Sequence, residues 1–393
     1  MTRSTKSSGR ARGALISPQG MLARARRLEE RMIEQLAALV RIESPSHDKP
    51  SVDRAAGQVA HWAKALGGQV KMHRQRHFGD SLEARFGPRR HADGPVLLLG
   101  HLDTVWEKGT LRSMPWRMTG DRISGPGVLD MKAGVVMMLT AIAMLRESEG
   151  LSRPVTMLLH GDEEVGSPAS RRLTETIARR SSAVYVLEPA QGEAGAYKTA
   201  RKGVGQYRLA VRGVAAHSGV DFLRGHSAVI ELARQVQKIA DITDLQRGIT
   251  VNPGVMGGGT RANVVAAEAW VEVDVRIEMA RDEARVERAL RGLRPHDREC
   301  RLHLSGGLNR PPMERTAGTV ALFRRARGIG EEMGIALEEA STGGGSDGNF
   351  TSALGIPTLD GMGAVGSGAH ALDEHCLRSH IAPRTAMLAA MLL

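Results

Sequence analysis

Short, continuous apolar runs alternate with helix-like segments over the first half of the chain. Residues 95–99, 155–160 and 183–187 are runs of this kind, each with the length of a buried strand. Residues 133–146, between the first two runs, carry apolar side chains at helical spacing. Buried strands separated by helices are typical of a parallel sheet that is covered on both faces. The pattern therefore predicts an α/β fold.

Acidic or histidine side chains follow each of these three predicted strands. His101 and Asp103 follow the first strand, Glu163 and Glu164 follow the second, and Glu188 follows the third. In open α/β sheets, ligands bind just outside the carboxyl ends of the strands. We therefore expect His101, the Glu163–Glu164 pair and Glu188 to meet at one edge of the sheet.

Two further candidates lie in glycine-containing segments. Asp130 follows a Gly/Pro turn and stands at or near the start of the predicted helix, where an aspartate often only caps the helix. His370 ends the sequence Gly-Ser-Gly-Ala-His, and glycine gives such a loop the freedom to bring the imidazole into a cleft. Both residues are the right type to join the group at the sheet edge.

This set of side chains suits a pair of divalent cations. Carboxylate oxygens and imidazole nitrogens bind zinc, with manganese or cobalt as alternatives, and one carboxylate commonly bridges two ions. Successive side chains on an extended backbone diverge, so Glu163 and Glu164 cannot both face one ion. One of them would bind metal and the other would act as a base. The alternative is that the whole set forms only salt bridges and helix caps.

At these residues the chain resembles the M20 family of zinc peptidases and deacylases, and in particular its glutamate carboxypeptidase branch. The resemblance runs from about residue 25 to the C-terminus and keeps the family motifs in order. It implies two zinc ions held by His101, Asp130, Glu164, Glu188 and His370. Asp130 would bridge the ions and precede a cis peptide bond. Glu163 would be the general base, and Asp103 would orient His101.

The resemblance extends to substrate-binding residues. The sequence Ala-Ala-His-Ser-Gly around His217 matches a motif whose histidine helps to bind the substrate carbonyl, often from the partner subunit. Asn263 and Arg276 match positions that bind the free carboxylate of the substrate. The glycine-rich loop that contains Gly344 matches one that lines the site. The segment before His370 departs from the branch, which more often has an aromatic residue there.

The hydrophobic pattern changes near residue 200. Strands are expected at 206–211, 249–255, 264–277 and 301–304, and helices at 227–242 and 282–293. The order βαββαβ predicts a ferredoxin-like sandwich, with a sheet edge or helix face suited to a second copy. Metal candidates lie on both sides of it. We therefore predict a lid and dimerisation domain at 201–312, inserted into a discontinuous catalytic domain at 21–200 and 313–393.

The catalytic domain is expected to contain a mixed, mostly parallel sheet, as the family resemblance implies. Its further elements are predicted helices at 22–40, 53–66 and 317–333 and a strand at 358–359. Residues 361–366 fit a dinucleotide-binding fingerprint literally, but no helix is predicted to open there. We therefore predict no nucleotide site.

Composition narrows the class of protein. A chain of 393 residues exceeds what one core usually supports, and 41% hydrophobic residues suit a soluble globular protein. The formal charge of +11 is scattered and aromatic residues make up only 3%, which argues against nucleic-acid binding. The chain has no run of 18 apolar residues, so no membrane span is predicted.

The N-terminus and the cysteines bear on localisation. Residues 1–20 are basic and lack the apolar stretch of a secretory signal, so we expect a disordered tail. Cys300 and Cys376 share no motif spacing, and unpaired thiols fit a reducing cytoplasm.

The sequence therefore predicts a cytoplasmic di-zinc hydrolase that cleaves an amide and releases an amino acid with a free carboxylate. A glutamate carboxypeptidase is the first choice. An N-acyl-amino-acid deacylase or a dipeptidase is the alternative in the same class, because all of these substrates share the α-carboxylate. A non-catalytic binding protein that keeps the fold is the alternative of another class.

Overall fold

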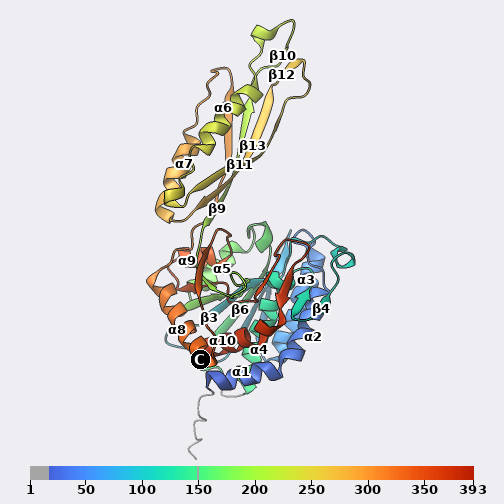
Figure 1. The fold of residues 1–393 in the computed structure, drawn as a ribbon, viewed down its shortest axis with the longest axis vertical. Helices are drawn as coiled ribbons and strands as arrows, with labels where there is room; N and C mark the ends of the chain where they lie inside the picture. The colour runs from blue at the N-terminus through green and yellow to red at the C-terminus, as the bar shows by residue number, and fades with distance from the viewer. Residues whose placement is uncertain (1–16, 148–149) are drawn as a thin grey trace, which may run out of the picture.

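The computed structural model describes residues 17–147 and 150–393 and shows a larger core domain from which a lid projects (Figure 1). The predicted tail at residues 1–20 falls outside the described residues up to residue 16. Its last residues are helical, because α1 (Pro18–Arg27) starts at Pro18 and Ser17 caps it. The prediction of disorder is therefore wrong for residues 18–20.

The core domain is built around a mixed, mostly parallel sheet, as predicted. Its strands lie in the order β1 (Gln69–His73), β2 (Gly79–Phe86), β6 (Val155–Gly161), β3 (Val96–His101), β7 (Ala183–Val186) and β16 (Thr358–Leu359). β6, β3, β7 and β16 run parallel, whereas β1 and β2 are antiparallel to their neighbours. The strands predicted from apolar runs, β3, β6 and β7, lie side by side and are buried. Their carboxyl ends therefore share one edge of the sheet.

α4 (Ala133–Glu147) is the central helix of the core domain. Every side chain from Ala133 to Leu145 is buried, because the helix is apolar on all sides. The stretch Val128–Glu147 is long and apolar enough to cross a membrane, but almost all of it lies inside the protein. α10 (Arg378–Met391) packs against α4 and α1, and the sequence did not predict it because Pro383 lies within it.

The N-terminal helices differ in part from the prediction. The helix expected at 22–40 is two helices, α1 and α2 (Glu29–Val40). Leu28 between them has φ −94° and ψ 0°, and its N–H donates to the carbonyl of Ala25 at 3.0 Å, which interrupts the α-helical pattern. α3 (Lys49–Ala65) begins earlier than predicted because Asp48 caps it by accepting a hydrogen bond from Ser51 N. α8 (Ala317–Met333) has the predicted bounds.

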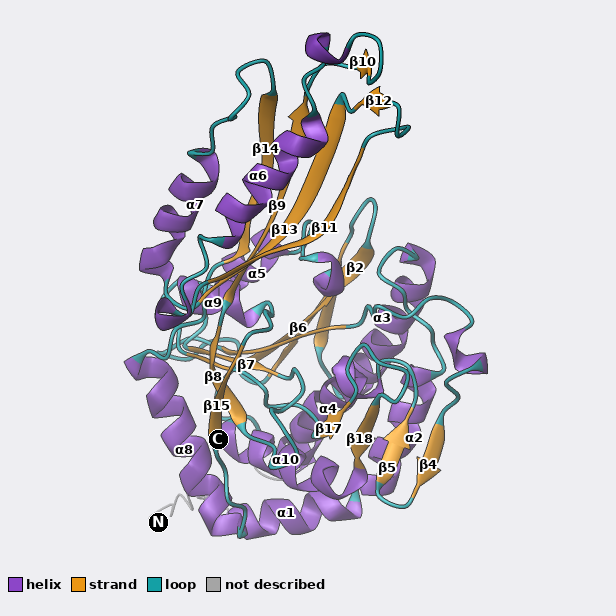
Figure 2. Cartoon of the chain, turned by 45° about the horizontal axis from the view of Figure 1, so that its top comes forward, coloured by secondary structure: helices purple, strands orange, loops and turns teal. Residues whose placement is uncertain are grey.

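The lid has the predicted ferredoxin-like fold. Its sheet has the order β11 (Thr250–Gly258), β13 (Glu268–Ile277), β9 (Gly203–Arg212) and β14 (Arg301–Arg310), with every neighbouring pair antiparallel. α6 (Ala228–Ala240) and α7 (Glu283–Arg291) cover one face of this sheet (Figure 2). Tyr207, Leu209 and Val211 alternate along β9 and are buried in the core of the lid.

The bounds of the predicted lid strands differ from those of the structure, and two strands differ most. Residues 264–277 form two strands, because β12 (Val264–Val265) pairs with β10 (Ala216–His217) before β13 begins. The strand expected at 301–304 continues to Arg310. Gly306, whose φ of 98° favours glycine, and Gly307 interrupt the alternation that would have predicted the second half of β14. The longer strand brings Arg310 to the core domain.

Smaller elements complete the core domain. β8 (Tyr197–Arg201) pairs in parallel with β15 (Glu339–Thr342). A second sheet has the order β17 (Gly366–Ser367), β18 (His375–Leu377), β5 (Arg122–Ser124) and β4 (Arg117–Thr119). The dinucleotide-like sequence before β17 is a loop whose carbonyls at Gly361 and Gly363 accept hydrogen bonds from the buried Arg384.

Candidate active site

His101 stands at the carboxyl end of β3 and is almost fully buried. The backbone carbonyl of Asp103 lies 2.9 Å from Nδ1 and fixes the ring. The opposite nitrogen, Nε2, therefore points at two carboxylates, 3.2 Å from Asp130 Oδ1 and 3.5 Å from Glu188 Oε1. A ring held at one nitrogen with carboxylates at the other is the usual arrangement of a metal-binding histidine.

Asp130 lies between the two candidate histidine ligands. Its Oδ1 faces His101, and its Oδ2 lies 3.3 Å from His370 Nε2. The residue sits in the turn Val128–Lys132, and the peptide bond that follows it is cis, as the family resemblance implies. A carboxylate with one oxygen toward each imidazole has the geometry that a bridging ligand requires.

His370 and Glu164 complete the second half of the cluster. Their Nε2 and Oε2 atoms are 3.2 Å apart. Glu164 is nearly buried, but the side chain of His370 is 52% exposed and its backbone has a left-handed φ of 64°. The fold therefore brings together all five predicted metal-binding residues, which come from segments that span most of the chain.

Asp103 does more than the sequence predicted. Its carboxylate lies 3.5 Å from His101 Nδ1, a longer approach than that of its own backbone carbonyl. The carboxylate accepts hydrogen bonds from the backbone N–H groups of Glu163 at 3.2 Å and Glu164 at 3.1 Å, and from the Ser46 hydroxyl at 2.7 Å. Asp103 therefore also fixes the turn that carries the candidate base.

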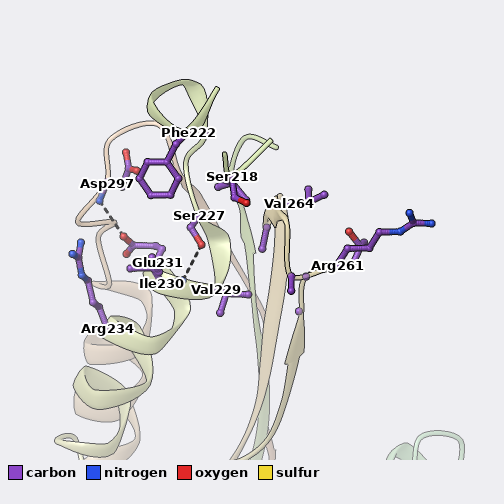
Figure 3. A pocket seen from close by; sticks show the side chains of 17 residues that line it. Ser218, Phe222, Ser227, Val229, Ile230, Glu231, Arg234, Arg261, Val264 and Asp297 are labelled. Atoms are coloured by element: carbon purple, nitrogen blue, oxygen red, sulfur yellow. Dashed lines mark hydrogen bonds between the residues drawn. The ribbon is translucent and has the colours of Figure 1, made fainter. Parts of the chain in front are cut away.

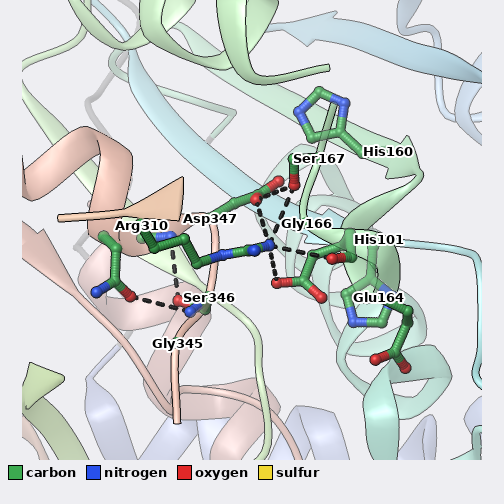
Figure 4. Close-up of polar contacts among 12 residues, drawn as sticks. His101, His160, Glu164, Gly166, Ser167, Arg310, Gly345, Ser346 and Asp347 are labelled. Atoms are coloured by element: carbon green, nitrogen blue, oxygen red, sulfur yellow. Dashed lines mark hydrogen bonds and ion pairs between the residues drawn. The ribbon is translucent and has the colours of Figure 1, made fainter. Parts of the chain in front are cut away.

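Glu163 has an unpredicted partner. Arg310 Nη2, at the end of β14, donates to Glu163 Oε1 at 2.7 Å and to Asp347 Oδ1 at 3.1 Å. Figure 4 shows this guanidinium reaching from the lid strand toward Asp347 and Ser167. The sequence analysis did not single out Arg310, because the strand predicted at 301–304 ends before this residue.

Burial and charge together make this cluster suited to cations. Burial raises the pKa of Glu163 well above its usual range and raises that of Glu164 to about 7, because a desolvated carboxylate is costly. Hydrogen bonds with Asp130 and Glu164 raise the pKa of His370 to about 10. The raised pKa values of the two glutamates mean that their negative charge is incompletely compensated, and bound divalent metal ions would compensate it.

The donor atoms are also close enough to share ions. Among the described residues, two sets have ligand atoms within 4.8 Å of one another: His101 with Asp130 and Glu164, and His101 with Glu163 and Glu188. Oxygen and imidazole nitrogen donors at this spacing fit zinc, manganese or cobalt.

The predicted substrate-binding residues divide between two places. Arg276 lines a cavity of about 300 Å³ with Glu163, Glu164 and Arg310. Its guanidinium is paired with Asp274 at 2.8 Å and donates to the carbonyl of Gly343, which precedes Gly344. Gly344 itself is exposed, and its carbonyl accepts from Arg201. These two predictions therefore fall beside the cluster.

His217 and Asn263 lie elsewhere. Both are exposed and adjacent, since Ser218 N donates to the carbonyl of Asn263 at 3.0 Å. β10, which contains His217, is at the end of the lid that is remote from the core domain (Figure 1). They stand beside a hollow of about 690 Å³, which Phe222, Ile230 and other lid residues line (Figure 3). Within one chain, the structure does not bring these two residues to the metal-ligand cluster.

The chain is similar to known peptidases over most of its length. The model of Peptidase family M20/M25/M40 matches residues 97–393. Carboxypeptidase G2 of Pseudomonas sp. (strain RS-16) is 27% identical over 371 residues, which make up 92% of this chain and 88% of that protein.

Solved structures share the fold. Aminopeptidase PepT from Bacillus cereus ATCC 10987 has a TM-score of 0.77 at 21% identity, covering 93% of this chain and 98% of PepT. Bacillus subtilis YXEP, a dinuclear metal binding peptidase from the M20 family, has a TM-score of 0.67 at 16% identity, covering 93% of this chain and 98% of YXEP. At these identities the likeness concerns the fold alone.

Proposed function

The chain belongs to peptidase family M20/M25/M40, and we propose that it is a zinc-dependent glutamate carboxypeptidase. It is a metallopeptidase with a candidate dinuclear metal site. The observation that carries the proposal is Asp130, whose two oxygens face His101 and His370 while Glu163 stands within the same cluster. The likeness to carboxypeptidase G2 over 92% of the chain supports the choice of bond.

A guanidinium in the adjoining cavity supports an anionic leaving amino acid, in a lining that also contains the carboxylates of Glu163 and Glu164. Arg276 and Arg310 both line the cavity of about 300 Å³ beside Glu163. Guanidinium groups bind carboxylates through paired hydrogen bonds, which lysine does not reproduce. Arg310 is held by Glu163 and Asp347. Arg276, whose ion pair with Asp274 is partly exposed, is therefore the guanidinium available to bind a carboxylate of glutamate.

The proposed reaction is hydrolysis of an amide bond. When bound by the five ligands, two zinc ions would polarise the scissile carbonyl and lower the pKa of a hydrolytic water. Glu163 accepts a proton from that water at its carboxylate and later donates it to the leaving nitrogen. A C–O bond forms, the C–N bond breaks, and the products are a carboxylate and free glutamate. Asp103 holds the turn that keeps Glu163 in reach.

A metal-dependent release assay on matched substrates tests this function. We expect glutamate release from N-benzoyl-glutamate or pteroyl-glutamate, its loss after chelation, and its return with zinc, cobalt or manganese. N-benzoyl-glutamine, which has the same shape without the side-chain charge, should be a poorer substrate. Preference for N-acyl derivatives of apolar amino acids, or for dipeptides, would instead identify a deacylase or a dipeptidase. Chains that bind no metal and hydrolyse none of these would contradict the proposal.

The lid supports a second proposal, that two chains form a homodimer and that His217 and Asn263 serve the partner's site. Apolar side chains are exposed around them: Val220 is 75%, Phe222 60% and Leu223 94% exposed. β11 is an edge strand of the lid sheet, and no strand of the described residues pairs with its outer side, which could therefore pair with a strand of another chain. Patches of this kind mark interaction surfaces.

Mixing two inactive variants tests the shared site. Glu163→Ala and His217→Ala should each have little activity alone. In a mixed dimer, one site receives its base from the His217 variant and its histidine from the Glu163 variant, so activity should return on mixing. No recovery after verified subunit exchange would contradict the shared site.

A further inference from the structure

Glu374 is a buried carboxylate close to the candidate metal ligands. Its side chain is fully enclosed, four residues beyond His370. Oε1 accepts hydrogen bonds from the backbone N–H groups of Leu129 at 2.9 Å and Asp130 at 3.1 Å. Oε2 accepts from Gly127 N at 3.0 Å and from the indole Nε1 of Trp106 at 2.7 Å. The carboxylate thus binds the backbone of the turn that presents Asp130.

The other end of the same residue belongs to the loop that presents His370. Ala371 N donates to the carbonyl of Gly368 at 2.8 Å, and Glu374 N donates to the carbonyl of Ala371 at 2.9 Å. These bonds form a compact loop between Gly368 and Glu374. A Cβ on Gly368, whose φ is 79°, would come within 2.9 Å of Glu374 N, so the loop requires glycine there.

The two loops lie far apart in sequence and have different surroundings. Asp130 is mostly buried, whereas the side chain of His370 is 52% exposed. An exposed ligand in a surface loop has little packing to fix its position. The hydrogen bonds of Glu374 join the loop of His370 to the buried turn of Asp130. In the same place, His370 Nε2 lies 3.3 Å from Asp130 Oδ2.

The charge of the carboxylate also has a counterpart. Lys132, in the same turn as Asp130, is buried and donates to the carbonyl of Ile42 at 3.0 Å, and the charge of Glu374 acts to raise the pKa of Lys132 against the effect of burial. A carboxylate that accepts several N–H groups forms stronger hydrogen bonds than a neutral amide does. Replacing Glu374 by glutamine would keep the volume of the side chain. One carboxylate oxygen would become an NH₂ group, which cannot accept hydrogen bonds, so some of the backbone N–H groups would lose their acceptor.

We propose that Glu374 is a positioning residue of the metal centre, which sets the distance between Asp130 and His370 by tying their loops together. This inference rests on the dinuclear centre of the proposed function. Glu374 acts through the ligands and contacts neither metal nor substrate. Because partners of metal ligands contribute to affinity, its loss should weaken zinc binding about 10- to 100-fold.

Zinc titration of the full-length chain tests this role. Metal-free wild type and Glu374→Gln are titrated with zinc against a chelating indicator, and the two stepwise dissociation constants are compared. We expect the weaker step to rise about 10- to 100-fold in the variant. Loading with cobalt gives a second measure, because the visible bands of Co²⁺ report ligand geometry. They should shift in Glu374→Gln.

Glu231→Gln is the matched control. Glu231 is equally buried in the lid and accepts hydrogen bonds from the backbone N–H groups of His296 and Asp297, both at 3.0 Å. Loss of this carboxylate should leave both zinc constants and the cobalt bands unchanged. If Glu374→Gln does not fold, Trp106→Phe is tested instead, because it keeps the carboxylate of Glu374 and removes one of its hydrogen-bond donors. We then expect a smaller weakening of zinc binding, roughly threefold or more.

The outcomes separate the two proposals. Wild-type zinc constants and cobalt bands in folded Glu374→Gln, or in Trp106→Phe where that variant decides, would overturn the positioning role. Equal weakening in Glu231→Gln would overturn it too, because the effect would then be a general loss of stability. These results leave the glutamate carboxypeptidase proposal intact, whereas a wild-type chain without zinc affinity contradicts the proposed function itself.

Discussion

The sheet edge of the core domain and the tip of the lid hold their polar side chains in opposite ways. At the sheet edge, His101 and Glu163 are nearly enclosed and each is fixed by a further residue, Asp103 or Arg310. At the tip, His217 and Asn263 are exposed, beside apolar side chains that nothing in the described chain covers. The comparison indicates that one chain can preorganise the candidate catalytic groups, whereas the tip would gain its surroundings from the partner chain in the proposed dimer.

Replacement of the candidate base is the severest test of the sheet edge. Glu163→Ala removes the proton acceptor but none of the five predicted ligands. We expect turnover to fall at least about 10³-fold, within the range that loss of a general base gives, while each chain still binds two metal ions. Steady-state kinetics and metal analysis of the same sample measure both. Turnover like that of the wild type would exclude Glu163 as the base.

Arg310 tests whether the sheet edge depends on the lid. Its side chain is 8% exposed, and Arg310→Met leaves Glu163 and Asp347 without their shared cation. Loss of one partner of a buried ion pair costs about 3–5 kcal/mol, which urea unfolding of the metal-loaded protein measures.

Arg208→Met provides the exposed comparison for Arg310. Arg208 pairs with Glu272 on the surface of the lid sheet at 2.7 Å, with side chains 44% and 54% exposed. Surface pairs contribute little, and the guanidinium also lies 4.0 Å from the centroid of the Trp270 ring, so we expect at most about 2 kcal/mol from both contacts. Equal effects of the two substitutions would show that Arg310 is not a structural link between lid and core.

The sheet edge was largely predictable because its signals are local. β3, β6 and β7 are apolar runs that end in acidic or histidine residues, and one geometric rule brings those ends together. The family resemblance added roles that the runs do not contain, such as the bridging position of Asp130. The lid order βαββαβ was readable for a similar reason, since the buried positions of β9 and β13 alternate.

The remainder depends on contacts between distant segments. Arg310 reaches Glu163 only because β14 continues through Gly306 and Gly307, where the alternation is lost. Glu374 binds backbone N–H groups about 245 residues away, and backbone donors carry no residue type that a sequence reveals. α10 was missed because Pro383 argued against a helix that tertiary packing stabilises. The local sequence pattern therefore predicts the candidate metal ligands better than it predicts the residues that position them through hydrogen bonds.

The lid tip is tested by placing a charge on its apolar surface. Leu223→Glu should leave the stability of one chain within about 0.5 kcal/mol, because the side chain is 94% exposed. In the proposed dimer the same charge would be buried, so we expect dissociation to become about 30-fold easier, or about 2 kcal/mol. Sedimentation equilibrium measures the constant.

A second exposed leucine provides the control for the tip. Leu245 is 76% exposed and lies near the base of the lid, where Lys202 donates to the carbonyl of Gly248. Leu245→Glu should not alter dimerisation. If both variants, like the wild type, sediment as single chains, the tip is not a dimer surface.

The smallest expected effect is a pH dependence inside the lid, at Glu231, which lines the hollow beside the tip. Burial acts to raise the pKa of Glu231, but hydrogen bonds from Asp297 N, Gln235 and His296 N outweigh it and lower that pKa below its usual value of 4.5. A lowered pKa means that the folded state favours the carboxylate. Its contribution is therefore present above the unfolded pKa and is lost as pH falls through the folded value.

Unfolding of wild type and Glu231→Gln across this range measures that contribution. Near pH 7 the wild type should be more stable by about 1 kcal/mol. The difference should shrink as the pH falls below 4.5, because the protonated side chain then resembles glutamine. A difference in stability that stays constant down to acid pH would mean that packing, and not the charge of Glu231, stabilises the loop at residues 296–297.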